Sequence, residues 1–314
     1  MGLPNNAFTT YSSIGNREDL EDVIYNVAPT ETPLLSALET TKAKAVNHEW
    51  QTDTIDTADT ANAVLEGDDA STDAITPTVR LGNICQIMDK VPRTTGTEEA
   101  IERAGRGSEM DYQVALKMKA LKIDMESIAF GTNQAKVTGG TGTARKMASI
   151  LSWLKTNTVE AGSDPATADG TATRTDGTQR AFTEALLKSS LQLVWASGGR
   201  PDTIAVGGFN KQQFSTFTGR ATPQEAASAK KIVNSVDAYE GDFGTQKVVA
   251  SRNMRARDCL ILQMDMWARA NLRGVGTTVL AKTGDSERKQ LLVEWTLVAR
   301  NEKASGGVFD LTTS

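Results

Sequence analysis

The strongest helical pattern in the chain covers residues 107–130. Apolar side chains recur there at helical spacing, at Met110, Val114, Met118, Leu121, Met125 and Ile128. Ser108 with an acidic residue three positions later is typical of a helix N-cap, and Gly131 is typical of a helix end. At about 1.5 Å per residue the helix would be roughly 35 Å long, which predicts the spine of a domain. Its remaining surface carries Lys117, Lys119 and Lys122.

The pattern of residues 46–95, which precede this helix, predicts a long two-stranded hairpin that extends away from the rest of the chain. The first strand has His48, Trp50 and Thr52 on one face, and the second runs from Val79 to Val91. Between them the chain has no Lys or Arg, and its acidic residues are Asp53, Asp56, Asp59, Glu66, Asp68, Asp69 and Asp73. A segment of one charge sign with few large apolar side chains cannot form a core. It is either a solvated loop or a flap that lies on a basic neighbour.

The pattern of the first 45 residues predicts an extended arm that can bury little apolar surface by itself. A short amphipathic turn surrounds Leu20, and a short apolar helix is expected within Val27–Leu38. Pro29 and Pro33 keep the chain extended around these elements, because proline fixes φ and disfavours helix in the residue before it. The partner surface of the arm is either another copy of the chain or the arm's own domain.

Beyond the spine helix, helical and extended patterns alternate, which indicates a compact α/β unit. The predicted elements are a short helix at Met147–Leu154, an amphipathic helix at Thr183–Ala196, a strand at Ile204–Val206 and a short helix at Asn210–Phe217. Residues 160–178 are rich in Thr, Asp, Gly and Ala and predict an exposed loop. Runs of branched residues predict later strands at Lys247–Ala250, Leu260–Met264, Thr277–Ala281 and Leu291–Val298.

The composition suits a soluble globular chain with a modest core and long exposed segments: 314 residues, 39% hydrophobic, with a mean hydropathy of −0.34. Cys85 and Cys259 each lie in an apolar run, so we expect buried thiols from a reducing compartment. We find neither a signal-peptide pattern nor an apolar stretch of about 20 residues, and we expect no membrane contact. The net charge of −5 argues against tight nucleic-acid binding through the overall field.

Sequence motifs for catalysis, metals and cofactors are absent. Any Ser–His–Asp or Cys–His site would have to use the single histidine, His48, for which a hydrogen bond in a strand is the simpler interpretation. Two distant cysteines and one histidine offer no zinc ligand pair, and residues 281–284 lack the glycines of a phosphate-binding loop. We therefore expect no catalytic residue, metal site or cofactor. A hydrolase with paired carboxylates stays open as an alternative, since the chain has 39 Asp and Glu residues.

Several segments, in a consistent order along nearly the whole chain, resemble the major capsid proteins of tailed bacteriophages. They are Val27–Leu38, Asn47–Asp53, Asn83–Ile87, Gly105–Met110, Arg145–Ala148, Gly199–Ile204, Asp242–Gly244, Ala281–Asp285 and Glu294–Leu297. Each motif alone is weak, and the ordered set is more specific. The resemblance is separate from the composition and periodicity described above.

This resemblance implies an α+β fold, the tailed-phage major capsid fold shared with encapsulins and the herpesvirus capsid floor. Residues 1–45 would form the N-terminal arm and 46–95 the extended loop. Residues 96–150 and 271–314 would form a peripheral domain around the spine helix. Residues 151–270 would form an axial domain with the exposed insertion at 160–178. The implied function is a non-enzymatic major capsid protein, which self-assembles through pentamers and hexamers into an icosahedral shell around double-stranded DNA.

The implied partners are other copies of the chain, a scaffolding protein, a portal, decoration proteins and packaged DNA bound without sequence specificity. The protein would be made in the cytoplasm of a host bacterium and reside in the virion. A non-viral, encapsulin-like compartment shell is the nearest alternative. We expect the acidic flap to lie on basic residues of a neighbour. The predicted inter-subunit contacts are Leu34, Leu35, Trp50, Asp68, Asp69, Asp73, Arg103, Arg106, Lys117, Lys119 and Lys122.

Overall fold

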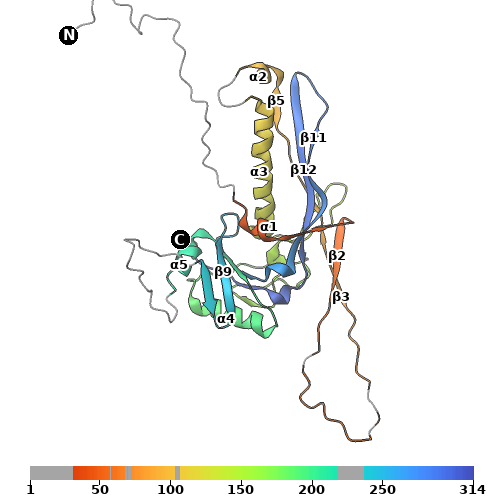
Figure 1. Ribbon diagram of the computed structural model, residues 1–314, viewed down its shortest axis with the longest axis vertical. Helices are drawn as coiled ribbons and strands as arrows, with labels where there is room; N and C mark the ends of the chain where they lie inside the picture. The colour runs from red at the N-terminus through yellow and green to blue at the C-terminus, as the bar shows by residue number, and fades with distance from the viewer. Residues whose placement is uncertain (1–30, 57, 68, 70–71, 103–106, 218–236) are drawn as a thin grey trace, which may run out of the picture.

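The computed structural model describes residues 31–56, 58–67, 69, 72–102, 107–217 and 237–314. A long helix, α3, stands beside a long hairpin, β11–β12, and a second sheet with its helices lies at the base of both (Figure 1). A thinner hairpin, β2–β3, projects from the same base and continues into a wide loop (Figure 1). The predicted turn around Leu20, and the predicted contacts Asp68, Arg103 and Arg106, lie outside the described residues.

The spine helix is confirmed as α3, Glu109–Phe130. The Ser108 hydroxyl accepts a hydrogen bond from the Asp111 backbone N–H at 3.2 Å, so the predicted N-cap is present. At the other end, the Gly131 N–H donates to the Ser127 carbonyl. Leu121 and Met125 face the main core, as the apolar spacing predicts, and Phe130 is buried there as well.

The first sheet has the order β1–β11–β12–β4, and β5 pairs with the far end of β12. Its strands are β1 (Glu39–Lys42), β4 (Gln86–Lys90), β5 (Arg93–Thr95), β11 (Trp267–Val279) and β12 (Ser286–Ala299), and the short helices α1 (Pro33–Ala37) and α2 (Gly96–Ala100) flank it. β1 runs parallel to β11, whereas β11, β12 and β4 are antiparallel. α3 packs on β12 and β4, so the helix and the hairpin form one elongated unit.

The predicted strand from Val79 to Val91 is wrong in one respect, because it is two strands. β3 (Val79–Ile84) pairs with β2 (Asn47–Thr52), while β4 leaves the hairpin and pairs with β12. The break falls at Cys85, whose N–H donates to the Val46 carbonyl at 2.7 Å as the last hydrogen bond of the hairpin. Local periodicity cannot reveal this exchange of partners, since β12 lies some 200 residues further along the chain.

The second sheet has the order β6–β13–β10–β7–β9–β8. Its strands are β6 (Thr158–Val159), β7 (Thr203–Val206), β8 (Ala238–Gly241), β9 (Gly244–Ala250), β10 (Cys259–Leu262) and β13 (Gly306–Val308). The helices of this unit are α4 (Glu184–Ala196) and α5 (Gly208–Phe214), with 3₁₀ turns at Ile150–Ser152, Met264–Met266 and Glu302–Ala304. β13 was expected in the peripheral domain with residues 271–314, but it pairs with β10 and β6.

The main core joins the two sheets. Trp153, Trp267 and Trp295 are fully buried in it, together with side chains of α1 and α3. The segment Met147–Leu154 forms only a single 3₁₀ turn rather than the predicted helix, although its apolar residues are buried as expected. Cys85 and Cys259 are buried free thiols, as predicted, and burial raises the pKa of Cys85 to about 11.

Candidate assembly surfaces

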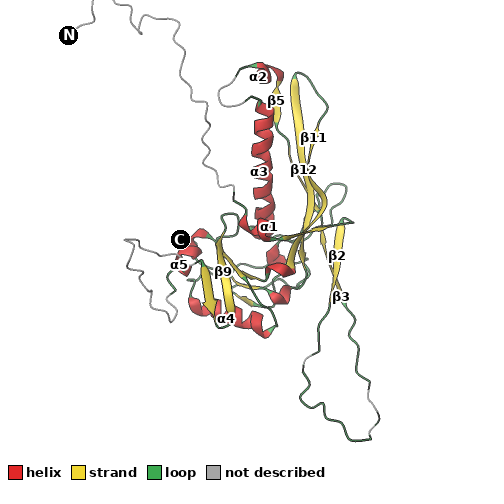
Figure 2. Cartoon of the chain, viewed as in Figure 1, coloured by secondary structure: helices red, strands yellow, loops and turns green. Residues whose placement is uncertain are grey.

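Residues 53–78 are the central part of the predicted 46–95 segment, and the name extended loop refers to them alone from here on. They carry the most exposed apolar side chains of the described chain. They continue the β2–β3 hairpin, whose register runs from Asn47 opposite Ile84 to Thr52 opposite Val79. Figure 2 shows neither helix nor strand in the described part of the loop. Ile55 and Ile75 are 99% and 93% exposed, and Val64 and Leu65 are 85% and 78% exposed. Because an isolated two-stranded ribbon is at best marginally stable, the exposed loop at its end gains little support from its own subunit.

The charge of the extended loop is carried on its surface. All of its described acidic residues are exposed: Asp53, Asp56, Asp59, Glu66, Asp69 and Asp73. Asp53 and Asp59 accept hydrogen bonds from nearby backbone N–H groups at 2.8 Å, which orders short turns without burying the carboxylates. A partner of this loop would therefore meet apolar side chains and negative charge together.

Trp50 anchors the hairpin to its own subunit. Its ring lies 5.4 Å from that of the buried Trp153 and 6.1 Å from that of His48, between ring centroids. The side chain is half-buried and packs on the main core. The indole Nε1 of Trp50 is buried and makes no hydrogen bond with the described residues. Much of the surface of Trp50 is thus already used within the subunit, and its contact with a neighbour stays a prediction.

Leu34 and Leu35, which were predicted to contact a neighbour, lie inside the subunit. They belong to α1, are 1% and 3% exposed, and pack in the main core with α3. Pro33 is the first residue of α1, as its fixed φ favours, so the predicted short apolar helix is present. Most of the surface of both side chains is thus used within the subunit, although Leu35 also lines the groove described next.

The predicted lysines are present on the surface of α3, on different sides of the helix. Lys117, Lys119 and Lys122 are exposed, and within the described ranges none of them forms an ion pair. Lys122 also lies on the rim of a groove of about 460 Å³ between α1, α3 and β11. Arg269 adds a second positive charge to this rim, and Met125 and Val293 contribute apolar lining. The groove therefore combines apolar surface with positive charge, the complement of the extended loop.

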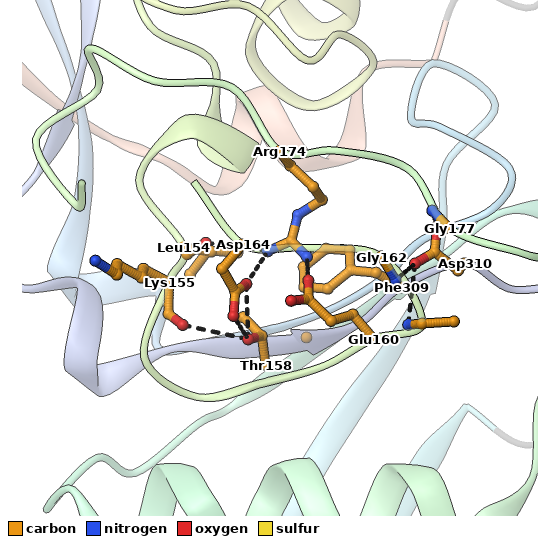
Figure 3. A network of polar contacts seen from close by, with 12 residues as sticks. Leu154, Lys155, Thr158, Glu160, Gly162, Asp164, Arg174, Gly177, Phe309 and Asp310 are labelled. Atoms are coloured by element: carbon orange, nitrogen blue, oxygen red, sulfur yellow. Dashed lines mark hydrogen bonds and ion pairs between the residues drawn. The ribbon is translucent and has the colours of Figure 1, made fainter. Parts of the chain in front are cut away.

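The insertion at 160–178 forms a loop, as predicted, but part of it is held to the rest of the subunit by buried ion pairs and hydrogen bonds. Arg174 is only 3% exposed and stacks on Phe309, with its guanidinium carbon 3.5 Å from the ring centroid. It pairs with Glu160 and with Asp164, the latter at 2.8 Å, and donates to the Leu154 carbonyl (Figure 3). Burial, followed by the neighbouring Asp164, keeps the pKa of Glu160 raised despite Arg174.

Asp310 fastens the same loop from the other side. Its carboxylate accepts backbone N–H groups of Ala161, Gly162 and Gly177 at 2.8–3.1 Å, and Arg257 donates to it at 2.7 Å. Burial alone would raise the pKa of Asp310, but these backbone donors and Arg257 outweigh it and lower the pKa. Asp310 has a φ of +61°, which Asp tolerates better than most residues. Nothing in the sequence distinguishes Arg174 or Asp310 from exposed loop residues.

The described residues contain no group of three or more His, Cys, Asp or Glu side chains that could hold a metal ion. Among the helices of the described chain, none is long and apolar enough to cross a membrane. Burial lowers the pKa of His48, which lies beside Trp50 in β2. The extended loop and the groove beside Lys122 are surfaces suited to contact between macromolecules.

Comparison with known proteins agrees with this interpretation. A model of the SU10 major capsid protein family matches residues 3–312. The major capsid protein of Escherichia phage Phieco32 is 26% identical, and the match covers 96% of both chains.

Solved structures share the fold at low identity. A subunit of the cyanophage A-1(L) capsid is 13% identical with a TM-score of 0.66, over 98% of this chain and 99% of that one. A subunit from the capsid of a native GTA particle is 10% identical with a TM-score of 0.65, over 96% and 98%. A chain from the structure of Phage G gp27 major capsid proteins and gp26 decoration proteins is 12% identical with a TM-score of 0.55, over 99% and 100%.

Proposed function

The chain belongs to the SU10 major capsid protein family and is a structural subunit of a tailed-phage shell, and we propose how its surfaces build that shell. Copies assemble through pentamers and hexamers into an icosahedral capsid that encloses double-stranded DNA. The extended loop of one subunit lies over the lysine-bearing surface of α3 and the groove beside Lys122 on a neighbouring subunit. The single observation that carries this proposal is the near-complete exposure of Ile55, Val64, Leu65 and Ile75.

Apolar burial supplies the driving force for this contact. Fully burying one large aliphatic side chain stabilises by about 1.5–3 kcal/mol, and four such side chains lie on the extended loop. Part of this gain offsets the lost freedom of the subunits and of the loop itself. A contact of modest strength, repeated many times in a closed shell, therefore suffices for assembly.

Charge sets the register of the contact. The acidic residues of the extended loop face Lys117, Lys119, Lys122 and Arg269 of the neighbour in this arrangement. Complementary charges of this kind fix orientation and speed association more than they add affinity. Because salt screens exposed charges over about 10 Å at 0.1 M, the rate of assembly should fall as the salt concentration rises.

The remaining parts of the chain fit into the same proposal. The first sheet with α3 is the peripheral domain, and the second sheet is the axial domain, which gathers around the five-fold and six-fold positions. A separate scaffolding protein, a portal and decoration proteins act with the shell, and the packaged DNA is held without sequence specificity. The protein is made in the cytoplasm of the bacterial host before it enters the virion.

The test is negative-stain electron microscopy of the full-length protein after size-exclusion chromatography. The wild type should give closed shells, tubes or ring-shaped capsomers. The double variant Val64→Ser with Leu65→Ser should give smaller species with the same circular dichroism, because both side chains are exposed in the subunit. Leu193→Ser is the matched control, since Leu193 is 41% exposed on α4, away from the proposed contact. Normal shells from the double variant would contradict the proposed contact.

A further inference from the structure

Glu126 is a fully buried carboxylate near the end of α3. One of its oxygens, Oε2, accepts the backbone N–H of Leu35 at 3.0 Å. The other, Oε1, accepts the Ser251 hydroxyl at 2.8 Å and the Asn253 side-chain amide at 3.2 Å. A buried carboxylate is costly unless hydrogen bonds satisfy it, and here both oxygens are used.

The three donors belong to different parts of the fold. Leu35 lies in α1, at the end of the proposed arm, and Ser251 and Asn253 follow β9 of the second sheet. Ser251 is itself tied to that sheet, because its N–H donates to the carbonyl of Val206 in β7 at 3.1 Å. Asn253 also donates to the Glu31 carbonyl at 3.1 Å. Glu126 therefore joins the arm, the spine helix and the second sheet at one point.

A close backbone approach marks the same point. A Cβ added at Gly131, just beyond α3, would overlap the carbonyl oxygen of Asn253. The end of the spine helix thus lies directly against the 251–253 segment, with no side chain between them. The contact leaves little room for the helix to tilt while the hydrogen bonds to Glu126 are intact.

Small tilts at this junction become large displacements elsewhere. α3 has 22 residues, so at about 1.5 Å per residue it is roughly 33 Å long. A rotation of about 5° at its base moves its far end by about 3 Å. The lysines proposed to receive a neighbouring subunit lie between these ends. A displacement of about 3 Å at the far end of α3 would change the angle between neighbouring subunits.

We propose that Glu126 is a positioning residue for assembly, which fixes α1 and the second sheet relative to the spine helix and thereby sets the angle between neighbouring subunits. The inference rests on the proposed function for its effect on particle shape. Its local part, the junction itself, is independent of assembly and can be measured in the subunit.

The decisive variant is Glu126→Gln in the full-length chain. A glutamine has one oxygen and one NH₂ group where the carboxylate has two acceptors, so either orientation leaves a buried donor facing another donor. Glu126→Gln combined with Asn253→Asp exchanges the two groups and restores a donor–acceptor match between them, although the carboxylate at 253 can no longer donate to the Glu31 carbonyl. Asp111→Asn is the matched control, because it makes the same change on an exposed carboxylate of the same helix, with a side chain 74% exposed.

Two readouts separate the local effect from the effect on assembly. Hydrogen–deuterium exchange should be about tenfold faster at the Leu35 amide and in residues 251–254 of Glu126→Gln, with circular dichroism retained. Electron microscopy should show a shift from the wild-type distribution of particle sizes and shapes. The double variant should recover part of both properties, and Asp111→Asn should change neither.

Wild-type exchange and wild-type particles in Glu126→Gln would overturn the proposal. Loss of the fold in both Glu126→Gln and the double variant would also overturn it, because Glu126 would then be a general stabiliser rather than a positioning residue. Failure of the wild type to form shells or capsomers would count against the proposed function instead. In that case the exchange at Leu35 still decides whether the junction depends on Glu126.

Discussion

The extended loop and the insertion at 160–178 are both rich in Thr, Ala and Asp but lie in very different environments. The extended loop has four large aliphatic residues and no basic residue, whereas the insertion has no large aliphatic residue and has Arg174. The extended loop projects from the molecule with its side chains exposed, whereas the insertion is fastened by Arg174 and Asp310. Low hydrophobicity therefore does not by itself predict a solvated loop. A buried arginine with carboxylate partners can hold such a segment as firmly as an apolar core.

Removing Arg174 tests this difference between the two loops most directly. In Arg174→Ala, Glu160 and Asp164 lose their partner in a largely buried site, and loss of one member of a buried ion pair destabilises by about 3–5 kcal/mol. Urea unfolding followed by tryptophan fluorescence would measure the change in the free energy of unfolding. Arg200→Ala is the control, because Arg200 is exposed and its side chain makes no hydrogen bond or ion pair with the described chain. A loss for Arg174→Ala no larger than that for Arg200→Ala would contradict the fastening role.

A second test compares two leucines that lie in the proposed arm and in the extended loop. Leu34→Ala should destabilise the subunit by about 2–5 kcal/mol, because it leaves a cavity in the main core. Leu65→Ala should leave the unfolding midpoint almost unchanged, since Leu65 is 78% exposed. Its effect should instead be seen in sedimentation, as a smaller fraction of assembled particles. Equal stability losses in the two variants would mean that Leu65 is packed within its own subunit.

The sequence predicts structural features that depend on neighbouring residues. It does not predict features that depend on contacts with residues far along the chain. Periodicity and the Ser108 cap are enough to locate α3, because both signals lie within the helix itself. The break at Cys85 depends on β12, and the burial of Arg174 depends on Phe309, both far along the chain. The role of Glu126 cannot be read from the sequence for the same reason, since its donors come from α1 and from the 251–253 segment.

Some features of the assembly surfaces can likewise be predicted from the sequence, and others cannot. The acidic charge of the extended loop and the lysines of α3 follow from the sequence, because long charged runs and exposed helix faces are local properties. The burial of Leu34 and Leu35 does not, because it requires knowing that α1 packs on α3. Residue type alone cannot show whether an apolar side chain is buried in its own subunit or is exposed for another.

The insertion should also respond to pH through Asp258. Burial raises the pKa of Asp258 to about 7 despite Arg255, which pairs with Asp258 and with Asp176 of the insertion. The folded chain therefore keeps a proton there between about pH 7 and pH 4 that the unfolded chain has released, so stability from this group rises as the pH falls. The slope is about 1.4 kcal/mol per pH unit in that window.

Asp258→Asn isolates this contribution, because the amide cannot titrate. Urea unfolding at about pH 5 and about pH 8 should show a pH dependence in the wild type that is reduced in Asp258→Asn. The sign is opposite for Asp310, whose lowered pKa contributes stability at neutral pH that is lost as acid protonates it. The same pH dependence in both chains would mean that Asp258 is not the titrating group.

The smallest effect on the subunit, and the clearest sign of its role, should come from charge reversal in the extended loop. Replacing Asp59, Asp69 and Asp73 by Lys should leave circular dichroism and the unfolding midpoint unchanged, because all three residues are exposed. Assembly should fail, since the reversed loop would meet Lys117, Lys119 and Lys122 with the same charge. Reversing those three lysines to Glu in the same chain should restore particles in part, as negative-stain microscopy would show. Normal shells from the first variant would show that charge does not set the register of this contact.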